Sequence, residues 1–401
     1  MSGARVSSGK ELEFRLRGGE SWRNPYDSYR WLREEDPVHR VEHPIYGNFW
    51  IYSRFEDVFE AVRNTDTYSS AQGLTPDKDA MKAFEGNAAP IVMMDPPEHT
   101  DFRRLVSHLM TPRRVAKFES EIRRYINKKI EIILDQKEVD IISNLFKPLP
   151  SFVVSHYLGV PLEDRELFDR WTNDIVAGNA KGDLGNQTST FELFEYSAKL
   201  FEKRKSNPGE DLISVLAASG EDVVSAMWAV GFVFTMITGG NDTTTGLLGG
   251  MVELVNEHPK QREILVSNPT LIADSIDEFL RLTSPVQNLA RTTTKDVRKR
   301  GANIPKGAKV LMLYASANRD QKEFGLTAEE LIVNRKPKRI LSLGYGPHHC
   351  LGAALARTMG RAALESLLEQ CPNFSVDVGK GSFSPGSFVR RYEYLPFVAN
   401  P

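Results

Sequence analysis

The spacing of apolar positions along the chain predicts a protein built mainly from helices. Apolar residues recur at intervals of three and four, which indicates helices at 24–35, 55–63, 98–110, 113–135, 161–176, 189–205, 268–281 and 351–370. Short runs of β-branched and aromatic residues predict strands at 48–52 and 309–313 and a terminal hairpin over 383–397. The stretches 71–93 and 178–187 lack periodicity, so we expect a long surface loop in the first and a polar connection in the second.

The longest predicted helix covers 221–258 and would be about 50 Å long if it is unbroken. Its first half is apolar on nearly all sides, so we expect it to cross the interior. Its middle reads Gly239-Gly-Asn-Asp-Thr-Thr244, where each glycine costs about 1 kcal/mol relative to alanine. Two interpretations stay open. The helix ends at the glycines and restarts with Asp242 as its N-cap, or the missing side chains open a groove for a flat cofactor.

Composition narrows the class of protein without identifying it. The chain has 401 residues, 41% of them hydrophobic, and a net charge of −2, so bulk charge gives no preference for nucleic acid or an anionic membrane. The first 20 residues are polar and lack the apolar core of a secretory signal or a membrane span, which favours a cytoplasmic protein. Two cysteines are too few for a disulfide framework and fit a reducing compartment.

Cys350 lies in the segment Leu343-Gly-Tyr-Gly-Pro-His-His-Cys-Leu-Gly352, a tight turn directly before a predicted helix. A sulfur at a helix N-terminus faces unpaired N–H groups and the positive end of the helix dipole, which favours the thiolate. The glycines would let a flat cofactor approach the backbone. From this segment alone, an inert structural cysteine, a zinc site with His348 and His349, and a cysteine nucleophile stay open beside a haem ligand.

The segment resembles the haem-binding loop of the cytochrome P450 superfamily, whose pattern is Phe-x-x-Gly-x-His/Arg-x-Cys-x-Gly. Gly346, His348, Cys350 and Gly352 match this pattern, whereas Leu343 stands where the family usually has phenylalanine. The resemblance implies that the thiolate of Cys350 is the axial ligand of the iron of haem b (iron protoporphyrin IX), with Gly352 beside the cofactor.

The segment from Gly239 to Thr244 matches the superfamily's Ala/Gly-Gly-x-Asp/Glu-Thr-Thr/Ser signature in a long helix. By this resemblance Gly239 lies against the haem, Thr243 hydrogen-bonds the O2 that binds there, and Asp242 relays protons. Asn241 is polar where many members carry an apolar residue.

Further motifs follow in the family's order. Glu278-Phe-Leu-Arg281 matches a Glu-x-x-Arg pair that the family buries against a later arginine, for which Arg335 is the candidate. Leu326-Thr-Ala-Glu departs from the usual Asp-Pro-Glu between them. The residues at positions that contact haem propionates in soluble bacterial members are His99, Arg103, Arg291 and His348.

The resemblance implies one cytochrome P450 domain over 1–401, mainly α with minor β. In this triangular, helix-rich fold the haem lies between the long central helix and the cysteine loop. The implied activity is that of a bacterial monooxygenase, which inserts one atom of O2 into an apolar or moderately polar small organic substrate. Candidate substrate contacts, placed by analogy, are Met93, Val286, Leu289 and Phe388.

Electrons must come from another protein, because the chain has no dinucleotide fingerprint and no iron–sulfur cysteine set. We therefore expect a separate ferredoxin and ferredoxin reductase as partners, with no nucleic acid and no membrane span. Candidate basic docking points are Arg103, Arg104, Arg113, Arg114 and Arg357. A haem-based sensor or electron carrier, and a helical binding protein without haem, are the alternatives.

Overall fold

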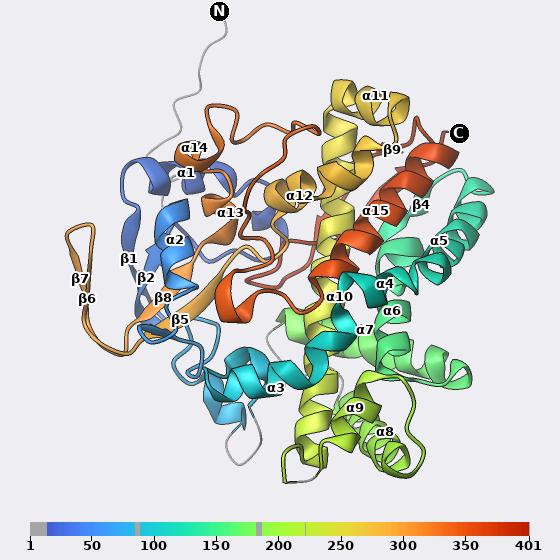
Figure 1. Cartoon of the computed structure of the whole chain (residues 1–401). Coiled ribbons are helices and arrows are strands. Elements are labelled where there is room, and N and C mark those ends of the chain that lie inside the picture. The colour runs from blue at the N-terminus through green and yellow to red at the C-terminus, as the bar shows by residue number, and fades with distance from the viewer. Residues whose placement is uncertain (1–13, 85–88, 182–186, 221, 401) are drawn as a thin grey trace, which may run out of the picture.

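The computed structural model describes residues 14–84, 89–181, 187–220 and 222–400. Helices dominate and only small sheets occur, as the spacing of apolar residues predicts. Figure 1 shows a sheet-containing part, which carries the first helices, beside a larger part made of helices. No helix among the described residues has the length and apolarity that crossing a bilayer requires.

The largest sheet has five strands in the order β1-β2-β8-β5-β3. Their bounds are β1 (Val38–His43), β2 (Gly47–Tyr52), β3 (Tyr68–Ser69), β5 (Leu289–Thr293) and β8 (Lys309–Met312). Strand β2 pairs in parallel with β8, so that Trp50 lies opposite Val310, although about 260 residues separate these two positions in the chain. Phe49 and Ile51 alternate with Trp50 along β2 and are fully buried, so one face of the sheet closes a core. Helices α1 (Tyr26–Glu34), α2 (Phe55–Ala61), α13 (Tyr314–Ala317) and α14 (Gln321–Phe324) adjoin it.

The remaining strands form three small sheets: β6 (Val297–Lys299) with β7 (Ala302–Ile304), β10 (Ser382–Phe383) with β11 (Tyr392–Tyr394), and β12 (Pro396–Val398) between β4 (Val139–Asp140) and β9 (Ser375–Val376). The expected hairpin over 383–397 is therefore wrong in its second half. The Leu395 N–H donates to Asp140 at 2.9 Å, which ties the chain beyond β11 to a distant segment. Local alternation of residues does not reveal such a long-range partner.

Helix α10 (Ala226–Glu257) runs through the helical part, and Figure 1 shows it beside the last long helix, α15 (Ala353–Gln370). Ser225 caps its N-terminus by accepting a hydrogen bond from the Trp228 N–H. The helix continues through Gly239 and Gly240, so the interpretation of a break with Asp242 as N-cap is wrong. The other long helices are α3 (Glu98–Ser107), α5 (Glu119–Leu134), α6 (Pro148–Leu158), α7 (Arg165–Lys181), α8 (Gln187–Ser206), α11 (Pro259–Ser267) and α12 (Leu271–Thr283).

Several helices differ from the prediction. The segment 113–135 forms two helices, α4 (Pro112–Ala116) and α5, and no helix was predicted at α6, α9 (Leu212–Ala218) or α11. Helix α6 is buried on nearly every side and so lacks a helical period, while Pro148 and Pro259 occupy first helical positions, where a missing N–H costs nothing. Short 3-10 or π turns are η1 (Gly19–Trp22), η2 (Ala80–Phe84), η3 (Ile91–Met93), η4 (His108–Met110), η5 (Ile142–Phe146), η6 (Leu162–Asp164) and η7 (Gly346–His348).

The two predicted connections are only partly described. The loop 71–93 contains η2 and η3, and its residues 85–88 lie outside the described residues. The connection predicted at 178–187 begins too early, because α7 continues to Lys181, and residues 182–186 lie outside the described residues.

Candidate functional site

The loop before α15 presents Cys350 through a backbone that glycine makes possible. Gly344 and Gly346 have φ angles of 65° and 69°, in the left-handed region that side chains disfavour. A Cβ on Gly346 would also approach the Val62 carbonyl oxygen to 3.1 Å. The Cys350 N–H then donates to the Leu343 carbonyl at 2.7 Å, which closes the turn. The sulfur is thereby placed three residues before the helix begins.

Opposing influences act on the Cys350 thiol. Burial raises its pKa, while the Gly352 N–H and the positive charges of Arg103 and Arg357 lower it. The net direction is upward, opposite to what the helix terminus alone predicts. Among the described residues no three His, Cys, Asp or Glu side chains gather as a metal site, which removes the support for the zinc interpretation.

The middle of α10 carries a series of side chains that bond back along the helix. The hydroxyls of Thr238 and Thr243 donate to the carbonyls of Phe234 and Gly239, at 3.0 and 2.7 Å. Such bonds compete with the helical ladder and loosen it locally. A Cβ added to Gly239 would meet no atom within 4 Å, so the helix has an open groove at this point. The second interpretation of the glycine motif, a groove with threonine back-bonding, agrees with this geometry.

Asp242 lies next to Thr243 and points toward a different set of residues. Its Oδ1 lies 2.5 Å from Nε of Arg391, and both side chains are almost fully buried. Arg391 also pairs with Glu393 at 2.5 Å, and Lys147 lies 2.5 Å from the same carboxylate. Burial raises the pKa of Asp242, and the charge of Arg391 opposes that rise. The chain of alternating charges leads from the buried acid to Glu393, which is partly exposed.

Buried donors without carboxylate partners gather near the cysteine loop. The rings of His99 and His348 lie 4.1 Å apart, and His99 Nδ1 is buried without a hydrogen-bond partner. The Arg291 guanidinium is buried and, within the part of the chain that the structure describes, donates only to the carbonyl of the adjacent Ala290. Arg103 donates to the His349 carbonyl at 2.6 Å.

The electrostatics of this group are unbalanced. Burial, followed by the charge of Arg291, lowers the pKa of His348 to about 3. Burial and then Arg103 lower the pKa of His99, and Asp95 only partly opposes them. Asp95 itself accepts hydrogen bonds from the segment at residues 69–70. We conclude that this group of donors lacks negative charge.

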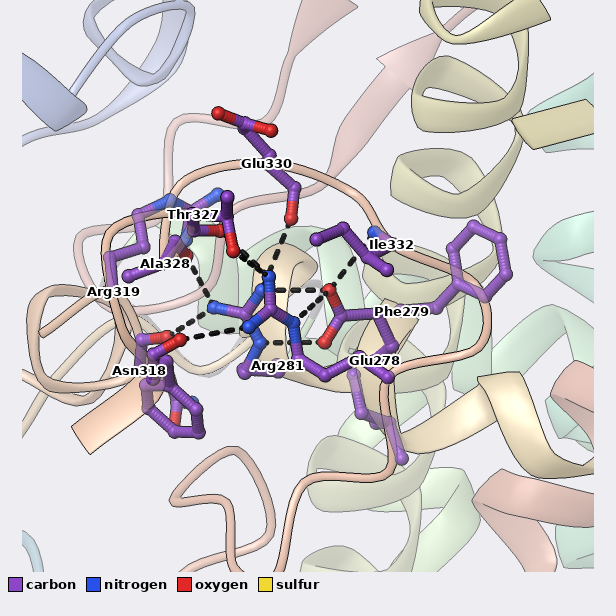
Figure 2. Close-up of polar contacts among 12 residues, drawn as sticks. Glu278, Phe279, Arg281, Asn318, Arg319, Thr327, Ala328, Glu330 and Ile332 are labelled. Atoms are coloured by element: carbon purple, nitrogen blue, oxygen red, sulfur yellow. Dashed lines mark hydrogen bonds and ion pairs between the residues drawn. The ribbon is translucent and has the colours of Figure 1, made fainter. Parts of the chain in front are cut away.

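The carboxylate of Glu278 accepts hydrogen bonds from Arg281 and Arg335. Figure 2 shows the contacts around Glu278. Glu278 and Arg281 are fully buried and share two hydrogen bonds of 2.7 and 2.8 Å. Arg335 adds a bond of 3.1 Å to the same carboxylate. The Nη1 atom of Arg281 donates to the backbone carbonyls of Asn318 and Ala328. All five N–H groups of Arg281 have acceptors among the described residues, and we assign the cluster a structural role.

The residues expected to contact substrate fall into two places. Val286 forms an isolated bridge with Val389, the Gln287 N–H donates to the Phe388 carbonyl, and Leu289 begins β5. Met93 instead lines a cavity of about 450 Å³. Ala71 and Met81 of that wall belong to the loop 71–93, which was also expected to face substrate, whereas sequence reasoning missed Met94 and Trp228. An aromatic residue near the start of the longest predicted helix was the available signal for Trp228.

Comparisons with known proteins agree on one family. A family model described as Cytochrome P450 matches residues 211–385. Cytochrome P450 130 of Mycobacterium tuberculosis is 46% identical over 395 residues, covering 96% of this chain and 97% of that protein. Vitamin D(3) 25-hydroxylase of Pseudonocardia autotrophica is 31% identical, covering 96% of both. The structure of the bacillaene polyketide synthase cytochrome P450 PksS of Bacillus subtilis superposes with a TM-score of 0.87 at 30% identity, covering 97% of this chain and all of that one.

Proposed function

The chain belongs to the cytochrome P450 family of haem-dependent monooxygenases, and from that premise we propose how its own residues perform the reaction. Cys350 ligates the haem iron, with Gly239 and Gly352 beside the cofactor, and His99, Arg103, Arg291 and His348 hold the propionates. The substrate is a lipophilic small molecule. The cytoplasmic location and the single domain over 1–401 stay predictions.

The residues present fit a haem. A haem carries two carboxylates, and the donors around His99 and Arg291 are buried without carboxylate partners. Burying such donors unpaired is unfavourable, so a ligand that supplies two carboxylates stabilises them. The groove at Gly239 leaves space on the α10 side. The unmatched donors are the observation that carries the proposal.

The absorption of the reduced carbon monoxide complex tests the ligand. Cys350→Ala should lose the thiolate-type spectrum, because no other sulfur replaces the ligand. Cys371→Ala is the matched control, since Cys371 is the other free cysteine and lies buried at the end of α15. A thiolate-type spectrum that survives in Cys350→Ala and disappears in Cys371→Ala would overturn the assignment.

When bound, the haem activates O2 for insertion into a C–H bond. The chain's part is to deliver protons and to place the substrate. The Thr243 hydroxyl, fixed by its bond to the Gly239 carbonyl, keeps its lone pairs available toward the groove. Asp242 delivers protons to the site, and its ion pair with Arg391, which also binds the partly exposed Glu393, holds the carboxylate in position, because a guanidinium does not itself give up a proton.

Thr243→Ala tests this role through the coupling of electron use to product. We expect more of the consumed electrons to appear as peroxide or water, because a hydroxyl that helps deliver protons is gone. Thr238→Ala removes the same kind of back-bonding hydroxyl about one turn earlier and should leave coupling unchanged. Equal coupling in wild type and Thr243→Ala would refute the role.

A lipophilic substrate is supported by the apolar side of the cavity, Met81, Met93, Met94 and Trp228, although the carboxylates of Asp95 and Glu98 also line its wall. The name of the Pseudonocardia relative indicates that a related chain acts on vitamin D3. Vitamin D3 is therefore a suitable first probe, with glucose as the polar control. We expect the probe to shift the absorption spectrum of the haem-loaded enzyme, and Met93→Glu to weaken that shift. A spectral shift with glucose alone would overturn the lipophilic class.

We also propose a ferredoxin and its reductase as electron donors, because the chain has only two cysteines for an iron–sulfur cluster. Arg113 and Arg114 lie on α4, which packs against α15, the helix that follows the cysteine loop. Reversing both charges to glutamate should slow reduction and flatten its dependence on salt. Arg40→Glu on β1 is the control. An unchanged reduction rate in the double variant would remove these residues from the docking surface.

A further inference from the structure

A second cavity lies at the other end of α10, far from the threonine motif. Its volume is about 270 Å³, and its wall comes from α1, the last turns of α10, the end of α12 and the segment after α13. Glu253 on this wall follows Thr243 by ten residues on α10, which places them roughly 15 Å apart along the helix axis. The cavity is therefore separate from the proposed haem site.

Arg319 is the unusual residue of this wall. It is 4% exposed, and its guanidinium stacks over the Tyr26 ring with 3.8 Å between the guanidinium carbon and the ring centroid. Within the described residues the guanidinium makes one hydrogen bond, a long one of 3.5 Å to the Ala315 carbonyl, and no carboxylate pairs with it. The adjacent Asp320 is occupied by the N–H groups of Phe55 and Lys322.

Glu253 and Glu329, two of the four acidic residues on this wall, are already paired, and burial raises the pKa of a third, Glu257, which favours its neutral form. Glu253 accepts two hydrogen bonds of 2.9 Å from Arg390, and Glu329 pairs with Arg30 and Arg33. Burial lowers the pKa of Arg319, and the nearby guanidinium groups of Arg281, Arg33 and Arg390 lower it further. A buried guanidinium among other cations is costly unless an anion reaches it.

We propose that this cavity binds a small carboxylate, whose two oxygens accept hydrogen bonds from the free edge of the Arg319 guanidinium. A planar fork of N–H donors matches a carboxylate with two parallel bonds. A monoanion fits better than a phosphate dianion, because one cation of the wall is unpaired and acidic side chains also line it: Asp27, Glu253, Glu257 and Glu329. The volume exceeds what one or two water molecules occupy.

The test uses the haem-loaded enzyme with acetate as the probe. Acetate binding is measured by isothermal titration and by the rise of the unfolding temperature in sodium acetate relative to sodium chloride at equal ionic strength. Wild type should bind acetate saturably, and Arg319→Gln should weaken that binding at least tenfold. Arg40→Gln, which changes an exposed arginine on β1, should bind as wild type does.

The outcomes separate the proposal from its rivals. Acetate effects that are equal in wild type and Arg319→Gln, or no saturable binding to wild type, would overturn it. Inorganic phosphate that binds through Arg319 while acetate does not would overturn the carboxylate class. Arg319→Lys keeps the charge without the fork and should bind acetate weakly, which keeps the proposal testable if Arg319→Gln folds poorly. The carbon monoxide spectrum should stay thiolate-type in every variant, so this site fails or stands independently of the haem assignment.

Discussion

Two groups of buried cationic or polar side chains in this protein differ in how their hydrogen bonds are used. In the group around Glu278, drawn in Figure 2, a fully buried carboxylate binds Arg281 and Arg335, and backbone carbonyls take further N–H groups. In the group around His99, counting partners among the described residues, one ring nitrogen has none and Arg291 reaches only the carbonyl of its neighbour. Both groups are buried, so burial alone does not distinguish them.

The difference shows how to separate a structural cluster from a ligand site when no ligand is present. A cluster whose donors and acceptors match stabilises the chain by itself. A cluster with donors only is costly until an acceptor arrives, and that acceptor is then bound tightly. Arg319 belongs to the second kind, although the backbone of its neighbour Asn318 serves the first.

The largest effect should come from breaking the matched cluster. Glu278→Gln leaves Arg281 buried without its counter-charge, and the loss of one partner of a buried pair costs about 3–5 kcal/mol of unfolding free energy. Urea unfolding followed by circular dichroism measures the change. Glu195→Gln, in an exposed pair with Lys199, should cost less than about 0.5 kcal/mol. A loss below about 1 kcal/mol in Glu278→Gln would contradict the structural role.

A smaller effect, which depends on bound haem, is expected in the group around His99, whose donors lack acceptors. Arg291→Met should accelerate haem loss about tenfold to a hundredfold, because a charge-assisted hydrogen bond contributes about 1.5–3 kcal/mol. Transfer of haem to an acceptor protein measures the rate. Haem-free protein should be no less stable in the variant, because a buried unpaired charge is gone. A destabilised haem-free variant with unchanged haem loss would place Arg291 with the structural cluster instead.

The sequence revealed the residues of the short motifs better than the elements that surround them. Cys350, Thr243 and the Glu278–Arg281 pair stand in short motifs, so local spacing was enough to select them. Continuous patterns also located α10 and α15 to within a few residues. Helix α6 escaped because it is buried on most sides, and β12 escaped because its partners lie far away in the chain.

Pairing in space was the part that the sequence could not supply. Arg391 lies about 150 residues beyond Asp242, and no motif connects them, so the ion pair appeared only with the structure. The upward shift in the pKa of Cys350 has the same origin, because burial depends on the packing of the whole loop rather than on the helix terminus. Arg319 was not singled out in the sequence, because no local pattern shows that its guanidinium is buried without a carboxylate.

The smallest predicted effect concerns pH and again separates the two groups. Burial holds the pKa of His99 below the value near 6.5 of an unfolded histidine, so the unfolded chain binds a proton that the native, haem-free chain does not. The stability contributed by neutral His99 is therefore complete above pH 6.5 and decreases as the pH falls toward the lowered native pKa. The slope from this group is at most about 1.4 kcal/mol per pH unit.

Urea unfolding of the haem-free protein at pH values from about 7.5 down to about 5 measures that slope, because this range spans the pKa of a histidine in the unfolded chain. His99→Gln should flatten it, because the variant has no proton to take up on unfolding, whereas the exposed His108→Gln should not. Bound haem should also flatten the wild-type slope, because a propionate beside the ring favours its protonated form. Identical slopes for wild type and His99→Gln would mean that the ring titrates equally in both states, and the unmatched donors would then need a different explanation.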